Sequence, residues 1–329
     1  MPDAAAVDLT VVVPMYNEED VLPLFVERLR PVADAWSVVY EILCVDDGST
    51  DSTPVLLQRL TREWDRARVV RLRANAGHQA AISAGLARAR GNWVVTIDAD
   101  LQDPPELIGE MLAVARGQGV DVVYGVREDR STDTAFKRVS AGLFYRSIRA
   151  LSDVDAHVDA GDFRLMSRAT VDAVNALPEH NRVLRLVVPA LGFPSASVGY
   201  ARAARAAGDS KYPLGKMIRL SVDSVTGFSI APLRFATWLG LTGGVAALGV
   251  LVFALVSMLM GNTLPGWTST VVIVSAVGAV QLLALGILGE YVGRTYAAVQ
   301  ARPEYFVAHD SLEPEAGRHR PGTEPQTRS

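Results

Sequence analysis

A long stretch without formal charge dominates the last third of this sequence. No Asp, Glu, Lys or Arg occurs from 235 to 289. Two apolar blocks lie here, at about 233–260 and 269–290, and a Pro- and Gly-containing turn at 262–266 separates them. Each block is long enough to cross a bilayer as a helix. We therefore expect a hairpin of two transmembrane helices; a buried hairpin in a soluble core is the alternative.

The charges around this hairpin predict its orientation. Basic residues flank both ends, which by the positive-inside rule places both ends in the cytosol. They are Lys211, Lys216, Arg219, Arg234, Arg294 and Arg302. Residues 1–10 have neither a basic region nor an apolar core, so we expect no signal peptide and an N-terminal domain that stays in the cytosol. The expected location is thus the inner (plasma) membrane, with multi-pass topology.

Composition narrows the class of protein further. Cys44 is the one cysteine, so no disulfide forms within the chain, as expected in a reducing compartment. The formal net charge is −4, which argues against general binding of nucleic acid.

The residues before the hairpin alternate between strand and helix patterns, which is typical of a mostly parallel, doubly wound sheet. Apolar runs predict strands at 7–13, 38–45, 69–72, 93–97 and 121–125. We expect Asn17 to be the N-cap of the first helix. The Gly-rich loops of dinucleotide-binding and P-loop domains are both missing from the sequence.

Potential metal ligands follow the strand at 93–97. Asp98, Asp100 and Gln102 alternate along the chain, so an extended backbone would point them toward one spot. Two carboxylates this close repel each other unless a cation lies between them, and oxygen ligands suit Mg²⁺ or Mn²⁺. An acidic loop with a helix cap is the alternative. The carboxyl end of a central strand is where open α/β sheets bind ligands, which favours the metal site.

Other polar side chains follow neighbouring strands. Tyr16 and Glu18 come after the first strand, where they could stack on a base or bind a ribose. Asp46 and Asp47 follow the second strand. An Asx-type turn without a functional role is the alternative, and it explains one aspartate here better than two. We interpret His78, which begins an Ala-rich helix, as a helix N-terminal or packing residue rather than a catalytic one.

Two basic segments come later in the chain. A predicted helix at 134–151 carries Arg138 on a basic face, which is either solvated or a surface for anionic head groups or a phosphorylated lipid. The segment 200–212 contains Arg205, Ser210 and Lys211, and is either a phosphate-binding flap or a basic juxtamembrane linker.

The region around the hairpin has two further predicted parts. Apolar residues recur at helical spacing from 214 to 228, which predicts a helix lying on the membrane surface. The tail after His309 is rich in Pro, Gly, Glu and Arg and is expected to be disordered.

Several motifs together resemble one enzyme family. In order they are Pro14-Met-Tyr-Asn-Glu18, Asp46-Asp-Gly-Ser-Thr-Asp51, Asp98-Ala-Asp-Leu-Gln-Asp-Pro-Pro105, Gly161-Asp-Phe-Arg164 and Arg205 through Ser210-Lys-Tyr212. Over roughly 8–306 the chain is similar to family 2 glycosyltransferases of the polyprenyl-phosphate (undecaprenyl- or dolichol-phosphate) sugar synthase type that carry two C-terminal membrane helices. The resemblance implies a GT-A fold and inverting transfer of a hexose from a nucleotide sugar to a polyprenyl phosphate, for cell-envelope glycosylation.

The resemblance also assigns roles to the residues of the matching motifs. It implies that Pro14, Tyr16, Glu18 and Asp47 hold the nucleoside, with a UDP-sugar favoured over GDP-mannose. It implies that Asp98, Asp100 and Gln102 surround the divalent ion, Mg²⁺ or Mn²⁺, and the donor diphosphate. Phosphate groups would be held by Arg127, Arg138, Arg205, Ser210 and Lys211, and Asp162 would join Asp100 and Arg127 at the reaction centre.

The chemistry of the acceptor bears on Asp162. A phosphate monoester has a second pKa of about 6 and is largely dianionic near neutral pH, so it needs little help from a general base. Asp162 is therefore expected to be a positioning group rather than an obligatory proton acceptor.

These expectations divide the chain into four parts. They are a cytosolic GT-A domain at 1–212, an interfacial amphipathic helix at 213–230, the two transmembrane helices within 231–292, and a cytosolic tail at 293–329 that is disordered after about 309. The small residues of the first span and the resemblance to membrane-anchored relatives indicate a homo-oligomer, with a tetramer as the expected form.

Two other functions are compatible with parts of the sequence. A processive polysaccharide synthase shares the paired aspartates, but two spans are few for a polymer channel and no Gln-x-x-Arg-Trp occurs. A membrane scaffold that binds a nucleotide sugar without turnover would tolerate the loss of Asp98 and Asp100, whereas both are present here.

Overall fold

The computed structural model describes residues 7–127, 160–178, 182–201, 231–260, 266–300 and 302–312. The chain forms two units. The sheet unit comprises Met1–Lys137, Val154–Ser210 and Pro303–Ser329, and the helix-pair unit comprises Arg138–Asp153 and Lys211–Arg302. The helices predicted at 134–151 and 214–228 lie outside the described residues, as do Arg138, Arg205, Ser210 and Lys211.

One eight-stranded sheet forms the centre of the sheet unit, with strand order β7-β5-β6-β4-β1-β2-β3-β8. The pairs β4-β1, β1-β2, β2-β3 and β5-β7 are parallel, while β6 and β8 run antiparallel to their neighbours. The predicted mostly parallel sheet is thus confirmed. Its strands are β1 (Leu9–Met15), β2 (Tyr40–Asp46), β3 (Ala67–Leu72), β4 (Trp93–Thr96), β5 (Val122–Arg127), β6 (Ala160–Ser167), β7 (Ser195–Tyr200) and β8 (Val307–Asp310).

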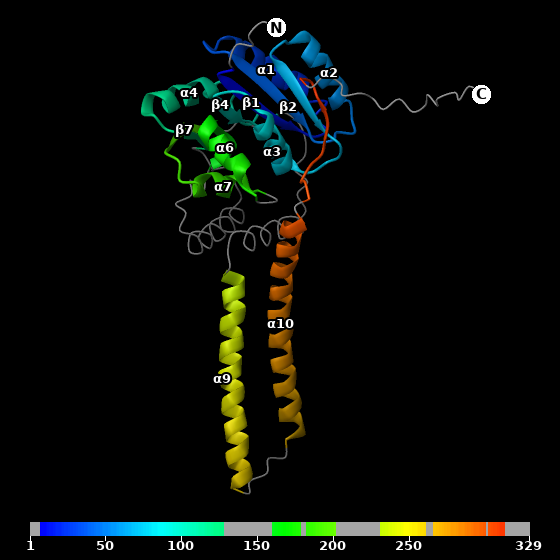
Figure 1. Ribbon diagram of the computed structural model, residues 1–329, viewed down its shortest axis with the longest axis vertical. Helices are drawn as coiled ribbons and strands as arrows, with labels where there is room; N and C mark the ends of the chain where they lie inside the picture. Colours follow the sequence, from blue (N-terminus) through cyan, green and yellow to red (C-terminus); the bar gives the residue numbers. More distant parts are fainter. Residues whose placement is uncertain are drawn as a thin grey trace, which may run out of the picture. The chain divides into compact units, whose positions relative to one another are not determined.

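Helices cover both faces of this sheet (Figure 1). The central strands carry apolar side chains on both faces, so both faces have to be covered. In β1, for example, Val11 and Val13 enter one core cluster while Val12 enters the other. The first cluster is covered by α1 (Leu22–Asp34), α2 (Thr53–Glu63) and α4 (Leu107–Gln118), and the second by α3 (His78–Arg88), α6 (Arg168–Ala176) and α7 (Leu184–Ala190).

The loop between β1 and α1 differs from the prediction. Asn17 is not a helix N-cap: α1 begins at Leu22, with Val21 before it, and Asn17 has a left-handed backbone with φ of 55°. Its side-chain Oδ1 accepts a 2.9 Å hydrogen bond from Thr50 N, and its own N donates to Ser49 Oγ at 3.0 Å. The loops that follow β1 and β2 are therefore joined directly, which fixes the edge where Tyr16 and Glu18 lie.

Three strands, β6, β7 and β8, were not predicted, and β8 also contradicts the expected disorder of the tail. β8 pairs antiparallel with β3, and Ser311 N donates to Val69 O at 2.9 Å just beyond it. Residues 310–312 thus belong to the folded sheet unit, although the tail after His309 was expected to be disordered. The tail beyond Leu312 lies outside the described residues.

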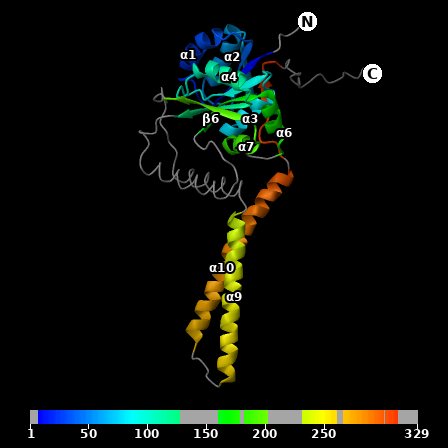
Figure 2. The same cartoon turned by 90° about the vertical axis from the view of Figure 1, so that its left-hand side faces the viewer.

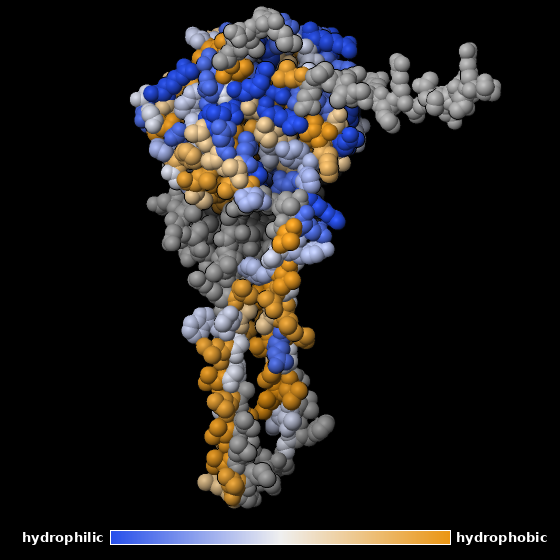
Figure 3. Space-filling view, in the orientation of Figure 1, coloured by the Kyte–Doolittle hydropathy of each residue, from blue (hydrophilic) through white to orange (hydrophobic). Residues whose placement is uncertain are grey.

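The helix-pair unit contains α9 (Ala231–Leu259) and α10 (Trp267–Gln300), which lie side by side (Figures 1 and 2). Large apolar side chains are exposed along both helices (Figure 3), including Trp238, Phe253 and Leu282. Among the described residues, one helix segment is long and apolar enough to cross a membrane, Ala276–Gly293 of α10, and the apolar segment of α9, Ala236–Val250, is shorter. The predicted hairpin of two transmembrane helices therefore stays a prediction, since by length and composition only the α10 segment among the described residues could span a membrane.

Candidate active site

The carboxyl edge of the parallel strands gathers most of the predicted site residues. β3, β2, β1 and β4 are parallel neighbours, so the residues that follow them lie along one edge of the sheet. Asp47 follows β2, Asp98 follows β4, and His78 begins α3 after β3. Asp162 enters from β6, the antiparallel neighbour of β4, and the Thr96 hydroxyl donates to its backbone carbonyl.

Asp162 lies at the centre of a group of hydrogen-bond donors. Its Oδ2 is 3.3 Å from His78 Nε2 and accepts a 3.1 Å hydrogen bond from Gln79 Nε2. Its Oδ1 lies 3.1 Å from Arg164 Nη2, and Arg185 Nη2 is 3.9 Å from Oδ2. The carboxylate is therefore surrounded by cationic and amide groups from β6, α3 and α7.

Arg164 fixes this arrangement from inside the sheet. Its side chain is 1% exposed, and its Nη1 donates to Leu184 O at 2.7 Å while Nη2 donates to Gly161 O at 2.9 Å. The guanidinium also lies 5.9 Å from the centre of the Tyr124 ring. A buried charge is tolerated only when it is paired and hydrogen-bonded, and Arg164 meets both conditions.

The charges of this group move the pKa values of Asp162 and His78. Burial favours a higher pKa for Asp162, but the hydrogen bond with His78 and the charges of Arg164 and Arg185 outweigh it and hold this pKa well below its usual range. Burial lowers the pKa of His78, yet the hydrogen bond with Asp162 and the charge of Asp98 outweigh that effect and raise it. Asp162 is therefore ionised at neutral pH and is a poor proton acceptor.

The environment of Asp98 raises its pKa, whereas that of Asp162 lowers it. Burial raises the pKa of Asp98 to about 6; His78 opposes this shift, and the carboxylates of Asp162, Asp103 and Asp100 reinforce it. Such clustered carboxylates disfavour ionisation unless a cation is bound, and their hard oxygen atoms suit Mg²⁺ or Mn²⁺. The donor set at this edge therefore fits a divalent ion.

The geometry of the three predicted metal ligands differs from the expected one. β4 ends at Thr96, and Leu101 has a left-handed φ of 60°, so the backbone turns between Asp98 and Gln102 instead of staying extended. The backbone N of Gln102 donates to Asp100 Oδ1 at 3.1 Å. Within the described residues, no set of three His, Cys, Asp or Glu side chains is placed to hold a metal ion. Protein ligands alone do not complete a site here.

A second buried group lies on the neighbouring strands. The Tyr200 hydroxyl, at the end of β7, donates to Asp103 Oδ1 and accepts from Arg127 at the end of β5. Gly161 lies beside Arg127, because a Cβ at Gly161 would be 3.8 Å from Arg127 Nη2. These contacts tie the acidic loop at 98–103 to the strands that carry Arg127 and Asp162.

The residues predicted to hold a nucleoside are also at this edge. Pro14 is buried in β1, whereas the side chain of Tyr16 is 43% exposed just after it. The backbone N of Glu18 donates to Thr53 Oγ1 at 2.8 Å. Asp47 is 3% exposed, and its two oxygens accept hydrogen bonds from Ala76 N and Gly77 N at 2.7 and 2.9 Å. Asp47 thus holds the loop that leads into α3.

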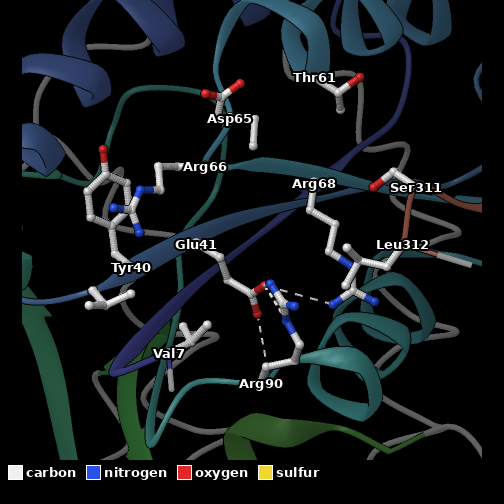
Figure 4. Close-up of a pocket in the computed structure, with 12 residues that line it drawn as sticks. Val7, Tyr40, Glu41, Thr61, Asp65, Arg66, Arg68, Arg90, Ser311 and Leu312 are labelled. Atoms are coloured by element: carbon white, nitrogen blue, oxygen red, sulfur yellow. Dashed lines mark hydrogen bonds and ion pairs between the residues drawn. The ribbon is translucent and has the colours of Figure 1, made fainter. Parts of the chain in front are cut away.

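A cavity of about 430 Å³ lies at the opposite, amino edge of the strands, beside the starts of β2 and β3. Figure 4 shows that Arg68 and Arg90 point toward Glu41, while Arg66 lies beside Tyr40. Arg90 Nε lies 2.8 Å from Glu41 Oε2, Arg68 is paired with Asp310, and the Arg66 guanidinium lies over the Tyr40 ring. These arginines are already engaged within the protein, so the polar groups of this cavity are arranged for stability rather than for chemistry.

Comparisons with known proteins agree with the chemistry of the carboxyl edge. Residues 10–174 match the model of glycosyl transferase family 2. The chain is 41% identical over 302 residues to the uncharacterized glycosyltransferase YkcC of Bacillus subtilis, covering 92% of this chain and 93% of the relative. The chain belongs to glycosyl transferase family 2. It is a glycosyltransferase, and its mostly parallel mixed sheet with helices on both faces is GT-A-like.

Other relatives of this family 2 glycosyltransferase have more informative names. A prophage bactoprenol glucosyl transferase homolog of Escherichia coli is 35% identical, over 91% of this chain and 98% of the relative. A prophage-derived bactoprenol glucosyl transferase of Shigella flexneri is 36% identical, over 91% of this chain and 97% of the relative.

One solved structure similar to this glycosyltransferase is glucosyl-3-phosphoglycerate synthase from Mycobacterium tuberculosis with Mn²⁺, UDP and phosphoglyceric acid. It is 21% identical with a TM-score of 0.44, and the match covers 68% of this chain and 77% of that chain.

The sequence did not identify every residue of this candidate site. His78 was interpreted as a helix N-terminal or packing residue; it does begin α3, but it also reaches Asp162 and lies 3.6 Å from Asp98 Oδ1. Its position after the third strand of a parallel sheet was the signal that favoured a role in the site. Arg185 gave no signal, because it lies in a short helix whose spatial neighbours come from α3 and β6.

Proposed function

We propose that this glycosyltransferase moves a hexose from a nucleotide sugar to a polyprenyl phosphate at the cytosolic face of the membrane, with inversion, and that the donor is a UDP-sugar. One observation carries the proposal: a prophage-derived bactoprenol glucosyl transferase and a prophage bactoprenol glucosyl transferase homolog share 36% and 35% identity with this chain across 97% or more of their own length. At 91% of this chain, these matches are too long to leave out the part that contains α9 and α10.

The reaction needs few proton transfers. An oxygen of the acceptor phosphate attacks the anomeric carbon, the bond from that carbon to the β-phosphate oxygen breaks, and the nucleoside diphosphate leaves with the electron pair. Because the acceptor is already largely dianionic near pH 7, with a second pKa of about 6, no residue has to remove a proton. The firmly ionised Asp162 is suited to hold His78 and Arg164 in place rather than to act as a base.

The chain's residues divide the remaining work. In this proposal Tyr16 and Glu18 contact the nucleoside, with Pro14 and Asp47 shaping the loops beneath it. Asp98, Asp100 and Gln102 would hold a divalent ion, Mg²⁺ or Mn²⁺, near the donor diphosphate. When bound, this ion stabilises the negative charge that develops on the leaving diphosphate. Further cations for the phosphates are proposed at Arg127, Arg138, Arg205 and Lys211, with Ser210 as a hydrogen-bond donor.

The connectivity of the chain supports a membrane hairpin. β8 follows α10, yet it pairs with β3 in the same sheet as β1 to β7, which precede α9. A folded sheet cannot lie on both sides of a bilayer, so the chain between Tyr200 and Val307 crosses an even number of times. If Ala276–Gly293 of α10 crosses, a second segment crosses as well. The 29 residues of α9 are long enough, at 1.5 Å per residue, to be that segment.

Transfer of radiolabelled sugar tests the proposal. The purified full chain in detergent is offered a panel of UDP- and GDP-sugars with undecaprenyl phosphate, with Mg²⁺, Mn²⁺ or chelator, and is compared with Asp100→Asn. We expect metal-dependent labelling of the lipid from one UDP-sugar and its loss in the variant. Labelling from GDP-mannose alone contradicts the choice of donor. No labelled lipid from any donor, with nucleotide binding intact, contradicts the proposed acceptor and favours a binding protein without turnover.

A further inference from the structure

Arg185 differs from the other cation beside Asp162. The fully buried Arg164 uses its donors on Leu184 O, Gly161 O and Asp162 Oδ1. Arg185 Nη2, in contrast, is 3.9 Å from Asp162 Oδ2, which is beyond hydrogen-bond length. Its Nε is buried and makes no hydrogen bond with any of the residues that the structure describes. Arg185 therefore lies within the site with at least one donor, Nε, that no described residue uses.

Asp162 does not require Arg185 as a partner. His78 Nε2 and Gln79 Nε2 already lie 3.3 and 3.1 Å from Oδ2, and Arg164 serves Oδ1. Arg164 and Arg185 place two permanent positive charges beside this one carboxylate, and Arg164 already pairs with it. A second anion is therefore favoured at Arg185, whose side chain is 41% exposed and can be reached from solvent.

The backbone next to Arg185 is held in position from both sides. Leu184 O accepts a hydrogen bond from Arg164 Nη1 at 2.7 Å, and Leu184 N donates to Gln79 Oε1 at 3.1 Å. The first turn of α7 is thus attached to β6 and to α3, the two elements that carry Asp162 and His78. This attachment fixes the backbone that carries Arg185 before any ligand binds, which reduces the entropic cost of binding.

We propose that Arg185 binds a phosphate oxygen of a reactant at this site. Its planar guanidinium presents paired donors that match two oxygens of a phosphate, and it stays charged at any pH the protein meets. The inference rests on the proposed function, in which two phosphate groups approach this edge: the diphosphate of the sugar donor and the phosphate of the lipid acceptor. Both present the same chemistry to Arg185, so the experiment has to separate them.

Equilibrium binding separates the two sources and does not depend on turnover. The purified full chain in detergent with Mg²⁺ is titrated with UDP and, separately, with a short-chain prenyl phosphate, for wild type, Arg185→Gln, Arg185→Lys and Asp162→Asn. Arg116→Gln is the control for loss of a positive charge, because Arg116 is exposed near the end of α4. Loss of a hydrogen bond to a charged group predicts roughly tenfold to hundredfold weaker binding of one ligand in Arg185→Gln.

The outcomes are distinct. Weaker UDP binding alone places the donor diphosphate on Arg185, and weaker prenyl phosphate binding alone places the acceptor there; both support the proposal. Affinities within twofold of wild type for both ligands overturn it. Equal weakening of both ligands that Asp162→Asn reproduces also overturns it, because Arg185 then acts only through Asp162. If wild type binds phosphate through Arg185 but labels no lipid, the proposed function fails and this inference stands.

Protein stability is controlled separately. Each variant is first checked for a cooperative unfolding transition. If Arg185→Gln lacks one, Arg185→Lys decides, because lysine keeps the charge and loses the planar fork. A several-fold loss of affinity for one ligand in Arg185→Lys then supports the proposal, and unchanged affinity for both overturns it.

Discussion

Arg68 and Asp310, which are 242 residues apart in the sequence, form a two-point ion pair where β3 meets β8. Arg68 Nε and Nη2 lie 3.2 and 2.7 Å from the two oxygens of Asp310, and the side chains are 8% and 2% exposed. Arg88 Nε, from α3, is 3.2 Å from Asp310 Oδ2. The segment that follows α10 is thus fixed to the edge of the sheet by one carboxylate and two arginines.

We predict that Asp310→Asn destabilises the sheet unit. Removing one partner of a buried ion pair leaves the other charge uncompensated and costs about 3 kcal/mol. The measurement is unfolding of the purified chain in detergent. Glu63→Gln is the matched control, because it breaks the exposed Arg59–Glu63 pair, whose side chains are 74% and 54% exposed. An Asp310→Asn variant as stable as this control would contradict the buried pair.

The same carboxylate predicts a dependence of stability on pH. Burial favours a higher pKa for Asp310, but its hydrogen bonds and the charges of Arg68 and Arg88 outweigh burial and lower the pKa. The stabilisation of the fold by ionised Asp310 is therefore complete above the pKa of about 3.9 that an aspartate has in the unfolded chain. It is lost as the pH falls through the lower pKa of Asp310 in the folded protein. The stability difference between wild type and Asp310→Asn should be large at pH 7 and shrink below about pH 4. A difference that grows on acidification contradicts the lowered pKa.

The sequence predicted five strands and missed β6, β7 and β8. The predicted strands and β8 differ in their kind of signal. β1 and β2 are apolar runs buried on both faces, so composition alone marks them. β8 has four residues, Val307–Asp310, and its partner β3 is more than two hundred residues away in the chain. Its stability comes from the contacts of Asp310 with Arg68 and Arg88, which no local pattern encodes.

The site divides in the same way. Asp98, Asp100 and Asp162 were predicted from motifs, and the structure places Asp98 and Asp162 around His78. The extended backbone expected from 98 to 102 is absent because the chain turns at Leu101. The pairing of His78 and Arg185 with Asp162 depends on how α3 and α7 pack against β6, and packing between elements is not visible in local spacing.

Gly85 gives a prediction about the packing of α3. A Cβ at this position would lie 2.3 Å from Val12 Cγ1 and 3.1 Å from Val45 Cγ2. The helix can meet the sheet this closely only because residue 85 has no side chain. We predict that Gly85→Ala lowers the free energy of unfolding by about 2 kcal/mol, as overpacking typically does.

Two further variants make this packing prediction specific. Gly117→Ala in α4, where nothing lies within 4 Å, should be neutral or slightly stabilising. Val12→Ala in the Gly85→Ala background removes the clashing methyl group, so the two substitutions together should cost less than the sum of their separate effects. Strict additivity in this double-mutant cycle would show that the Val12 contact is not the cause.

Arg164 gives a prediction that links stability and activity. Arg164→Lys keeps the positive charge but cannot reach Leu184 O, Gly161 O and Asp162 Oδ1 together. We expect a loss of at least about 2 kcal/mol in unfolding free energy, because buried acceptors lose their partners, and slower sugar transfer, because Asp162 loses its support. Arg30→Lys is the control, since Arg30 also lies over an aromatic ring, that of Trp64, but is exposed. If Arg164→Lys is as stable as wild type but transfers sugar slowly, the predicted role of Arg164 in stability is wrong and only its role in the site remains.

The apolar face of α10 predicts how the chain attaches to a membrane. Leu282 and Leu285 lie within Ala276–Gly293 and are 71% and 62% exposed, so in the proposed hairpin they would meet lipid or another chain. An arginine at the centre of a membrane helix costs about 2.5 to 3.5 kcal/mol on insertion scales. Leu282→Arg with Leu285→Arg should therefore move the protein from the carbonate-resistant membrane fraction into the extractable one. Tyr296→Arg, on the same helix but beyond this segment, should leave the distribution unchanged, because an arginine near a helix end reaches the interface. Equal resistance of the double variant and wild type would show that α10 does not cross the bilayer at this segment.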